Sequence, residues 1–348
     1  MRTDHPVYRQ DLAAVRAAAP SLEPLRGRTV LITGATGLVG AFLTDALALA
    51  SREEGLELKL VAVSRDAERA RARFAEWDSV RAISMDLTRP GKLPEADFIV
   101  HAAANAHPAA FSADPVGTML GNFEGVRALL EQLRAQGHGR LLFLSTGEIY
   151  GENPAITEGF SEGDFGKIDP MNPRSCYPES KRAAETLCAS YVRQYAVDAV
   201  AARLCYTYGP TVTPGNSRAD AQFLRRALAG EDVVLKSAGS QVRSYCYAAD
   251  AAGALLTLLL LGTSGEAYNV ANRGSVASIR EYAETLARLA GVRVTFDLPT
   301  DAERQGYSVV TRAVQRPDKL EALGWRPRFS LEEGLKHTLK ILSGEALK

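Results

Sequence analysis

The sequence predicts an α/β protein built on a doubly wound, mostly parallel sheet with a smaller C-terminal lobe. Three observations support this prediction. Apolar, β-branched runs alternate with longer helical patterns up to about residue 210, as in strands joined by crossover helices. A glycine-rich turn stands between the first strand and the first helix of this series. Beyond residue 210 the alternation loosens, and Pro, Gly and Asn gather in GPTVTPGNSRAD.

The elements follow in order along the chain. Residues 1–26 predict an amphipathic lead-in helix, 27–210 the sheet domain, and 211–348 mainly the second lobe, with some chain returning to the sheet. Strands are expected at 29–33, 56–64, 82–87, 96–104, 140–146 and 199–209. Helices are expected at 117–137 and 181–195, and the apolar segment 251–262, which is too short to span a bilayer, is expected to be a buried helix.

Composition excludes several classes of function. Lys plus Arg and Asp plus Glu number 41 each, so the chain offers no long-range field to nucleic acid or to an anionic membrane. Its four cysteines lack CxxC spacing, which disfavours a zinc site or a disulfide framework and indicates a reducing, cytoplasmic setting. The charged N-terminus has no apolar core of a signal peptide. We therefore expect a small-molecule partner and no metal.

The turn GATGLVG points to a dinucleotide. Glycines directly after a strand allow a tight turn and let backbone N–H groups approach a pyrophosphate at the helix N-terminus. The alternative is a plain tight turn, but the strand–turn–helix context favours a Rossmann-type dinucleotide-binding domain. The predicted cofactor contacts are Gly34, Thr36, Gly37, Leu38, Val39, Gly40, Ser64, Arg65, Asp86, Leu87, Ala102, Ala103, Ala104 and Lys181.

The end of the second strand bears on the choice between NAD and NADP. The acidic residue that would grip the ribose hydroxyls is missing, and VAVSRD places Ser64 and Arg65 there instead. An arginine at this place can pair with a 2′-phosphate, which favours NADP. The alternative is a solvated surface arginine. Asp86, at the end of the third strand, is a weaker candidate for facing the adenine.

The chemistry is expected at two further segments. In CYPESK, Tyr177 and Lys181 are four residues apart on one face of a helix. A phenol with a pKa of about 10 is a poor base at neutral pH, but a nearby ammonium and a cationic nicotinamide would lower that pKa. In LSTGEIYG, Thr146 could hold a substrate hydroxyl while Tyr177 takes its proton and hydride leaves for the cofactor.

These segments carry a family resemblance. The order TGATGLVG, HAAA, LSTGEIYG, YPESK and RLCYTYGP resembles the extended short-chain dehydrogenase/reductases, the NAD-dependent epimerase/dehydratase family, that modify nucleotide sugars. The resemblance runs from about Thr29 to Leu335 and is closest to the UDP-glucuronate decarboxylases. It implies that Thr146, Tyr177 and Lys181 are catalytic, and it favours NAD. The substrate-binding residues expected on these grounds are Ser145, Tyr206, Arg243 and Arg312, and His107 is added because its loop, ANAHPAAF, could reach the sugar.

Two positions depart from the family pattern. The residue after Thr146 is Asp in the 4,6-dehydratases and Ser in the decarboxylases, but here it is Gly147, which disfavours 4,6-dehydration. The sixth strand normally ends in an Asn that contacts the diphosphate, and the aligned residue is Tyr206. Glu148 either handles a proton next to a C4 ketone, as catalyst, or only orients a sugar hydroxyl or caps backbone N–H groups.

The resemblance implies an enzyme that oxidises a nucleotide-diphosphate sugar at C4 with bound NAD or NADP and acts on the 4-keto intermediate. A decarboxylase outcome is favoured, and an epimerase or an NADP-dependent keto-sugar reductase is the alternative. A non-catalytic dinucleotide sensor is a remote alternative, because such proteins often lose the Tyr or the Lys. Relatives pair the helices that correspond to 117–137 and 176–195 across a two-fold axis, so a homodimer through a four-helix bundle is expected.

Overall fold

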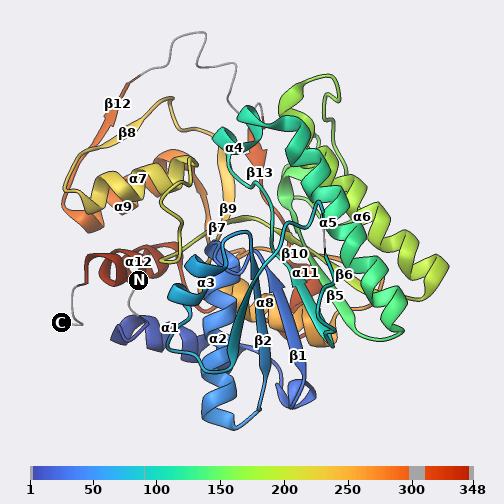
Figure 1. The fold of residues 1–348 in the computed structure, drawn as a ribbon. Helices are drawn as coiled ribbons and strands as arrows, with labels where there is room; N and C mark the ends of the chain where they lie inside the picture. The colour runs from blue at the N-terminus through green and yellow to red at the C-terminus, as the bar shows by residue number, and fades with distance from the viewer. Residues whose placement is uncertain (1–2, 90, 298–309, 345–348) are drawn as a thin grey trace.

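A central sheet of seven parallel strands organises the chain in the computed structural model, which describes residues 3–89, 91–297 and 310–344 (Figure 1). The strand order is β10-β6-β5-β4-β1-β2-β3. The strands are β1 (Thr29–Thr33), β2 (Lys59–Ser64), β3 (Val80–Ser84), β4 (Phe98–His101), β5 (Arg140–Thr146), β6 (Asp198–Leu204) and β10 (Ala267–Val270). This order confirms the predicted doubly wound, Rossmann-type sheet.

Helices cover both faces of this sheet, because successive strand side chains point to opposite faces. Along β1, Val30 and Ile32 pack into one hydrophobic core and Leu31 into the other. The first core is covered by α2 (Leu38–Glu54) and α8 (Ala248–Leu261), with α1 (Pro6–Ala18) packed on them. The second is covered by α5 (Pro115–Gln136) and α6 (Cys176–Tyr195), which lie side by side in Figure 1.

The prediction of a single sixth strand over residues 199–209 is wrong. β6 ends at Leu204, and Tyr206–Tyr208 forms β7, which pairs with β9 (Val242–Tyr247) in a second sheet. Cys205 stands at the break, and its backbone N–H still donates to the Val270 carbonyl of the first sheet. The apolar pattern continues across this break, so the sequence could not locate it. The third strand also ends earlier than expected, at Ser84.

The second lobe is built around the sheet of β7, β9, β11 (Val276–Ser278) and β13 (Arg312–Ala313). A two-stranded ribbon, β8 (Val233–Leu235) with β12 (Val294–Phe296), extends it. The remaining elements are α3 (Ala67–Arg73), α4 (Pro108–Ala113), α7 (Ala219–Leu228), α9 (Ile279–Ala290), α11 (Asp318–Ala322), α12 (Leu331–Ser343) and the short 3₁₀ turns η1 (Glu23–Leu25), η2 (Gly147–Tyr150) and η3 (Pro173–Ser175). Among the helices that the structure describes, none is long and apolar enough to cross a membrane.

Candidate active site

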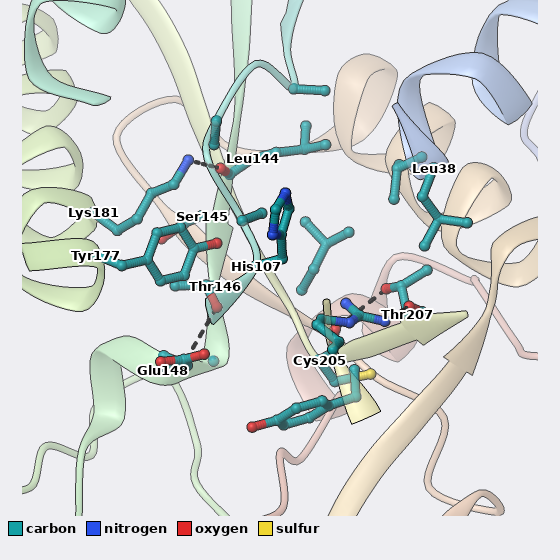
Figure 2. Close-up of a pocket in the computed structure, with 18 of the residues that line it drawn as sticks. Leu38, His107, Leu144, Ser145, Thr146, Glu148, Tyr177, Lys181, Cys205 and Thr207 are labelled. Atoms are coloured by element: carbon teal, nitrogen blue, oxygen red, sulfur yellow. Dashed lines mark hydrogen bonds between the residues drawn. The ribbon is translucent and has the colours of Figure 1, made fainter. Parts of the chain in front are cut away.

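A cavity of about 240 Å³ opens at the carboxyl ends of β1, β4, β5 and β6 (Figure 2). This edge of a doubly wound sheet is where such folds bind their ligands. Figure 2 shows Ser145, Thr146, Glu148 and Tyr177 along one side of the cavity, with Leu38 across from them. Of the residues predicted from the sequence, those that line it are Gly34, Gly37, Leu38, Val39, Gly40, Ala102, Ala104, His107, Ser145, Thr146, Glu148, Tyr177, Lys181 and Tyr206.

The glycine turn fits a dinucleotide. Gly34 has a φ of +65°, and a Cβ added there would come within 2.7 Å of the Ala102 backbone, so only glycine is compatible with this close approach of β1 to β4. Helix α2 begins just behind the turn, and no side chain caps its N-terminus at Gly37. Its first N–H groups are therefore available to a pyrophosphate. These features match the pyrophosphate of a bound dinucleotide.

The remaining predicted cofactor residues do not line the cavity: they are Thr36, Ser64, Arg65, Asp86, Leu87 and Ala103. Arg65 is exposed at the end of β2, beside β1 in the sheet. Asp86 stabilises the turn in which it lies. Its carboxylate accepts hydrogen bonds from the backbone N–H and the hydroxyl of Thr88, at 2.9 and 2.8 Å. These bonds lower the pKa of Asp86. Leu87 belongs to the core beneath α5.

Tyr177 and Lys181 both lie on α6 and are buried. The Lys181 Nζ donates to the Leu144 carbonyl at 2.8 Å, which anchors it to the end of β5. Burial lowers the pKa of Lys181 to about 7. Burial also raises the pKa of Tyr177 well above its usual value, and the charge of Glu148 raises it further, while the Thr146 hydroxyl acts in the opposite direction. These side chains alone keep Tyr177 protonated.

Glu148 lies in η2, directly after β5. Its backbone N–H donates to the Thr146 hydroxyl at 3.2 Å, so the threonine begins the turn that carries the carboxylate. The carboxylate forms an ion pair with Arg174, with 3.0 Å between Oε2 and Nη1. Sequence reasoning missed Arg174, although it lies three residues before Tyr177. No local pattern indicates that this side chain reaches back to the end of β5.

Gly147 faces the side chain of Gln315, a second residue that the sequence analysis missed. A Cβ at position 147 would lie 2.5 Å from the Gln315 amide oxygen. The amide is oriented by its other end, because Nε2 donates to the Arg203 carbonyl and to Asn269 Oδ1, both at 2.9 Å. An acceptor oxygen therefore stands beside the turn that carries Glu148. The chain segment after β13 supplies this residue, far in sequence from β5.

Tyr206 lines the cavity with Arg243 behind it. The Arg243 guanidinium lies 5.3 Å from the centre of the Tyr206 ring, a cation–π contact. Arg243 itself is buried, does not line the cavity, and donates to the carbonyls of Val242 and Val310. Arg312, on β13 beside β9, is likewise outside the lining. Within the described residues, the Nε atoms of both arginines are buried without a hydrogen-bond partner.

Arg218 is a third residue that sequence reasoning missed, and like Gln315 it lines the cavity. It directly precedes α7 and forms an ion pair with Asp220, and its guanidinium also donates to the Thr207 carbonyl. His107, predicted from its loop, lines the same cavity and lies 3.1 Å from the Ser217 hydroxyl. Burial and the charge of Arg218 lower the pKa of His107. Among the residues that the structure describes, no cluster of His, Cys, Asp or Glu could hold a metal ion.

Comparison with known proteins gives concordant results. The model of the NAD dependent epimerase/dehydratase family matches residues 30–271. UDP-glucuronic acid decarboxylase 5 of Arabidopsis thaliana is 31% identical over 330 residues, which cover 91% of this chain and 92% of that protein. Among solved structures, UDP-glucose 4-epimerase of Thermus thermophilus in complex with NAD is 28% identical with a TM-score of 0.75, covering 91% and 100% of the two chains.

A UDP-glucuronic acid 4-epimerase of Bacillus cereus, solved with UDP-glucuronic acid and NAD, has a TM-score of 0.76 over 91% of this chain and 99% of that one. At 20% identity this likeness shows the fold alone. Both of these solved neighbours are 4-epimerases, whereas the reported relative from Arabidopsis thaliana is a decarboxylase.

Proposed function

The chain belongs to the NAD dependent epimerase/dehydratase family, and from this premise we propose that it oxidises a nucleotide sugar at C4 and then acts on the 4-keto intermediate. The observation that carries the proposal is the meeting of Thr146, Tyr177 and Lys181 at one cavity beside the glycine turn. We favour decarboxylation of a UDP-glucuronate-like substrate, because the relatives at 31% identity bear the name UDP-glucuronic acid decarboxylase.

The first half of the reaction uses the residues on β5 and α6. A bound nicotinamide cofactor would accept the hydride from C4 and, after the second half of the reaction, return it to the C4 ketone, so that the product differs from the substrate by carbon dioxide alone. The N-terminus of α2, just after the turn at Gly34, would hold the pyrophosphate, which is an anion. Thr146 binds the C4 hydroxyl, and the phenolate form of Tyr177 accepts its proton and becomes the phenol. Lys181, which lies on the same face of α6 and is fixed to the Leu144 carbonyl, is the cation that stabilises this phenolate before the proton is transferred.

The second half of the reaction is assigned to Glu148. A 4-keto uronate is a β-keto acid, so the C5–C6 bond can break with loss of carbon dioxide, and its electron pair enters an enolate. C5 must then receive a proton, and we assign the handling of that proton to Glu148. The earlier alternative, in which Glu148 only orients a hydroxyl, stays a competing interpretation. Arg243 and Arg312, with buried N–H groups that lack a partner in the described structure, are proposed to serve the diphosphate.

Two observations favour a second candidate function, that of an epimerase. UDP-glucose 4-epimerase of Thermus thermophilus is 28% identical, and Gly147 does not supply the hydroxyl that the decarboxylases carry after the threonine. The alternative also includes an NADP-dependent keto-sugar reductase. In such an enzyme the cofactor exchanges with the solution instead of staying bound. A dinucleotide sensor without turnover is disfavoured, because Tyr177 and Lys181 are both in place.

The cofactor and the assembly belong to the same proposal. Exposed Arg65 favours NADP, whereas the family description and the NAD-bound neighbour favour NAD. We propose a homodimer through α5 and α6, because α5 exposes apolar side chains on the surface away from the sheet. These are Val116, Met119 and Leu120, which are 67%, 45% and 53% exposed. A cytoplasmic setting is proposed from the four cysteines, all buried and unpaired.

The experiment that tests the function is a product analysis. The purified protein is incubated with UDP-glucuronate, UDP-glucose and CDP- and dTDP-linked sugars, and the products are analysed by mass spectrometry and NMR. Loss of the mass of carbon dioxide from UDP-glucuronate is the expected result. An unchanged mass with altered sugar couplings identifies the epimerase instead. Unchanged sugars throughout, with no reduced cofactor formed, would show that the proposal is wrong.

A further inference from the structure

The ion pair between Glu148 and Arg174 joins two parts of the site. Glu148 lies in η2 after β5, and Arg174 lies in η3 just ahead of the helix that carries Tyr177. The two side chains are 27% and 23% exposed, so the pair is mostly buried. Salt and water screen such a pair less than they screen a pair at the surface.

Arg174 has few other uses in the described structure. Its guanidinium lies 5.1 Å from the centre of the Phe111 ring, and its Nε is buried without a hydrogen-bond partner among the described residues. Arg182, on the neighbouring helix α6, differs in this respect, because it donates to two backbone carbonyls as well as to Glu179. Arg182 thus has the contacts of a structural arginine, whereas Glu148 is the main polar partner of Arg174.

The charge of Glu148 also affects the pKa of Tyr177. Phe111, under the Arg174 guanidinium, stacks on the Tyr177 ring with 5.5 Å between centres. After burial, the charge of Glu148 is the largest influence that raises the pKa of the phenol. The other groups that affect the pKa of this phenol are Thr146, Arg218 and Tyr206, and on its own helix Cys176 precedes it and Lys181 lies one turn further on. Neutralising Glu148 therefore favours loss of the phenol proton.

We infer that Arg174 is a positioning residue that fixes the Glu148 carboxylate and screens its charge from Tyr177. This inference rests on the proposed function, in which Tyr177 serves the oxidation at C4 and Glu148 the proton at the next carbon. The two groups must be ionised in the same small site, and like charges oppose that. A guanidinium beside the carboxylate lets both half-reactions proceed at one pH.

The test compares wild type, Arg174→Met, Glu148→Gln and the double variant, each with cofactor and a nucleotide sugar that the wild type oxidises. The rate of the oxidation is followed against pH by reduced-nicotinamide absorbance in a single turnover. Arg174→Met should move this profile to higher pH by about one unit or more. Glu148→Gln in the same chain should move it back, because the unscreened charge is then gone. A merely structural arginine would not be rescued in this way.

Product formation and folding give two further readouts. Glu148→Gln and Arg174→Met should each lower product formation by about a hundredfold, and the double variant should be no slower, since both act through one carboxylate. Urea unfolding of all four proteins shows whether a loss of product formation is instead caused by misfolding. Arg140→Met is the matched control, because Arg140 forms a partly buried ion pair with Asp198 at the opposite end of β5. It should lose stability without moving the pH profile.

The outcomes distinguish a failure of the inference on Arg174 from a failure of the proposed function. If the wild type oxidises the sugar but Arg174→Met leaves the pH profile unmoved, or Glu148→Gln does not reverse the shift, the inference is wrong and the proposed function stands. If the wild type neither reduces cofactor nor alters any sugar, the proposed function is wrong and the inference falls with it. Should Arg174→Met not fold, Arg174→Lys replaces it. That variant keeps the charge, so it should keep the pH profile while losing product formation.

Discussion

The amide oxygen of Gln315 lies 2.5 Å from the point where a side chain at Gly147 would begin. These two positions therefore share one volume at the catalytic turn. Because Gln315 is buried and both of its Nε2 bonds are made to fixed acceptors, its side chain cannot easily withdraw. The missing side chain at position 147 is thus matched by a side chain that enters from the other lobe.

Replacing Gly147 by Ser should destabilise the protein, because the new Cβ overlaps the Gln315 amide. We expect a loss of about 1–3 kcal/mol in the free energy of unfolding, measured in urea. Gly163→Ser is the matched control, since nothing lies within 4 Å of a Cβ at that exposed glycine. Adding Gln315→Ala to Gly147→Ser should recover part of the loss. A Gly147→Ser protein as stable as the control would contradict the overlap.

Tyr177→Phe should abolish turnover and leave the fold intact, because it removes only the hydroxyl while the ring still stacks on Phe111. The expected loss is about a hundredfold to ten-thousandfold in kcat, the range of a single acid–base group. Tyr195→Phe, a more exposed tyrosine on the same helix, serves as control. Near-normal rates in Tyr177→Phe, with an unchanged circular dichroism spectrum, would remove the phenol from the mechanism.

Lys181 should make stability depend on pH. Folding lowers the pKa of Lys181 from 10.5 to about 7, so the unfolded chain binds more protons between these two values. The contribution of Lys181 to the free energy of unfolding therefore rises with pH across this window and is least favourable below pH 7. Relative to wild type, Lys181→Met should be more stable below pH 7, and this difference should shrink towards pH 10.

Urea unfolding at a pH below 7 and at one near 10 measures that difference. Asp250, whose pKa burial raises to about 7, titrates in both proteins, so its effect cancels in the comparison. A stability difference that does not change with pH would mean that Lys181 titrates alike in the folded and unfolded states.

Arg65→Ala should separate the two cofactors. If the exposed guanidinium pairs with a 2′-phosphate, its loss should weaken NADP binding by about tenfold or more and leave NAD binding nearly unchanged. Binding of each cofactor is measured by isothermal titration calorimetry. Arg69→Ala, an exposed arginine on the neighbouring helix α3, controls for general charge. Equal weakening of NAD binding and NADP binding would argue against recognition of the 2′-phosphate by Arg65.

Leu120→Glu should convert the proposed dimer into a monomer, because it places a charge in the apolar surface of α5. Sedimentation velocity gives the mass in solution. Leu261→Glu is the control, since Leu261 is 47% exposed at the end of α8 and outside the proposed interface. A wild type that sediments as a monomer, or a Leu120→Glu protein that remains a dimer, would rule out this interface.

The features best predicted from the sequence are those that short stretches encode. The glycine turn at Gly34 and the four-residue spacing of Tyr177 and Lys181 depend only on strand and helix periodicity. The cavity accordingly contains the predicted residues of the first, fourth and fifth strand ends. Their roles as catalytic and binding residues stay predictions until the variants are measured.

What the sequence could not predict depends on pairing between distant segments. Gln315 and Arg218 reach the cavity from the second lobe, and nothing in their own segments marks them as site residues. The division of residues 199–209 at Cys205 follows from the choice of sheet partner, which the continuous apolar pattern does not reveal. Arg174 is close to Tyr177 in sequence, but its partner is set by the fold of η2.

Strand β10 has a consequence for how the chain is made. Residues 201–204 of β6 pair with 267–270 of β10, so the last strand of the parallel sheet is synthesised only after α7, β8 and β9 of the second lobe. A nascent chain that ends near residue 210 has β6 as a bare edge and lacks α8 over one face of the sheet. The ribosome must therefore extend the chain through residue 270, well past the start of the second lobe, before the parallel sheet is complete, and gene fragments that divide the two lobes should yield insoluble halves.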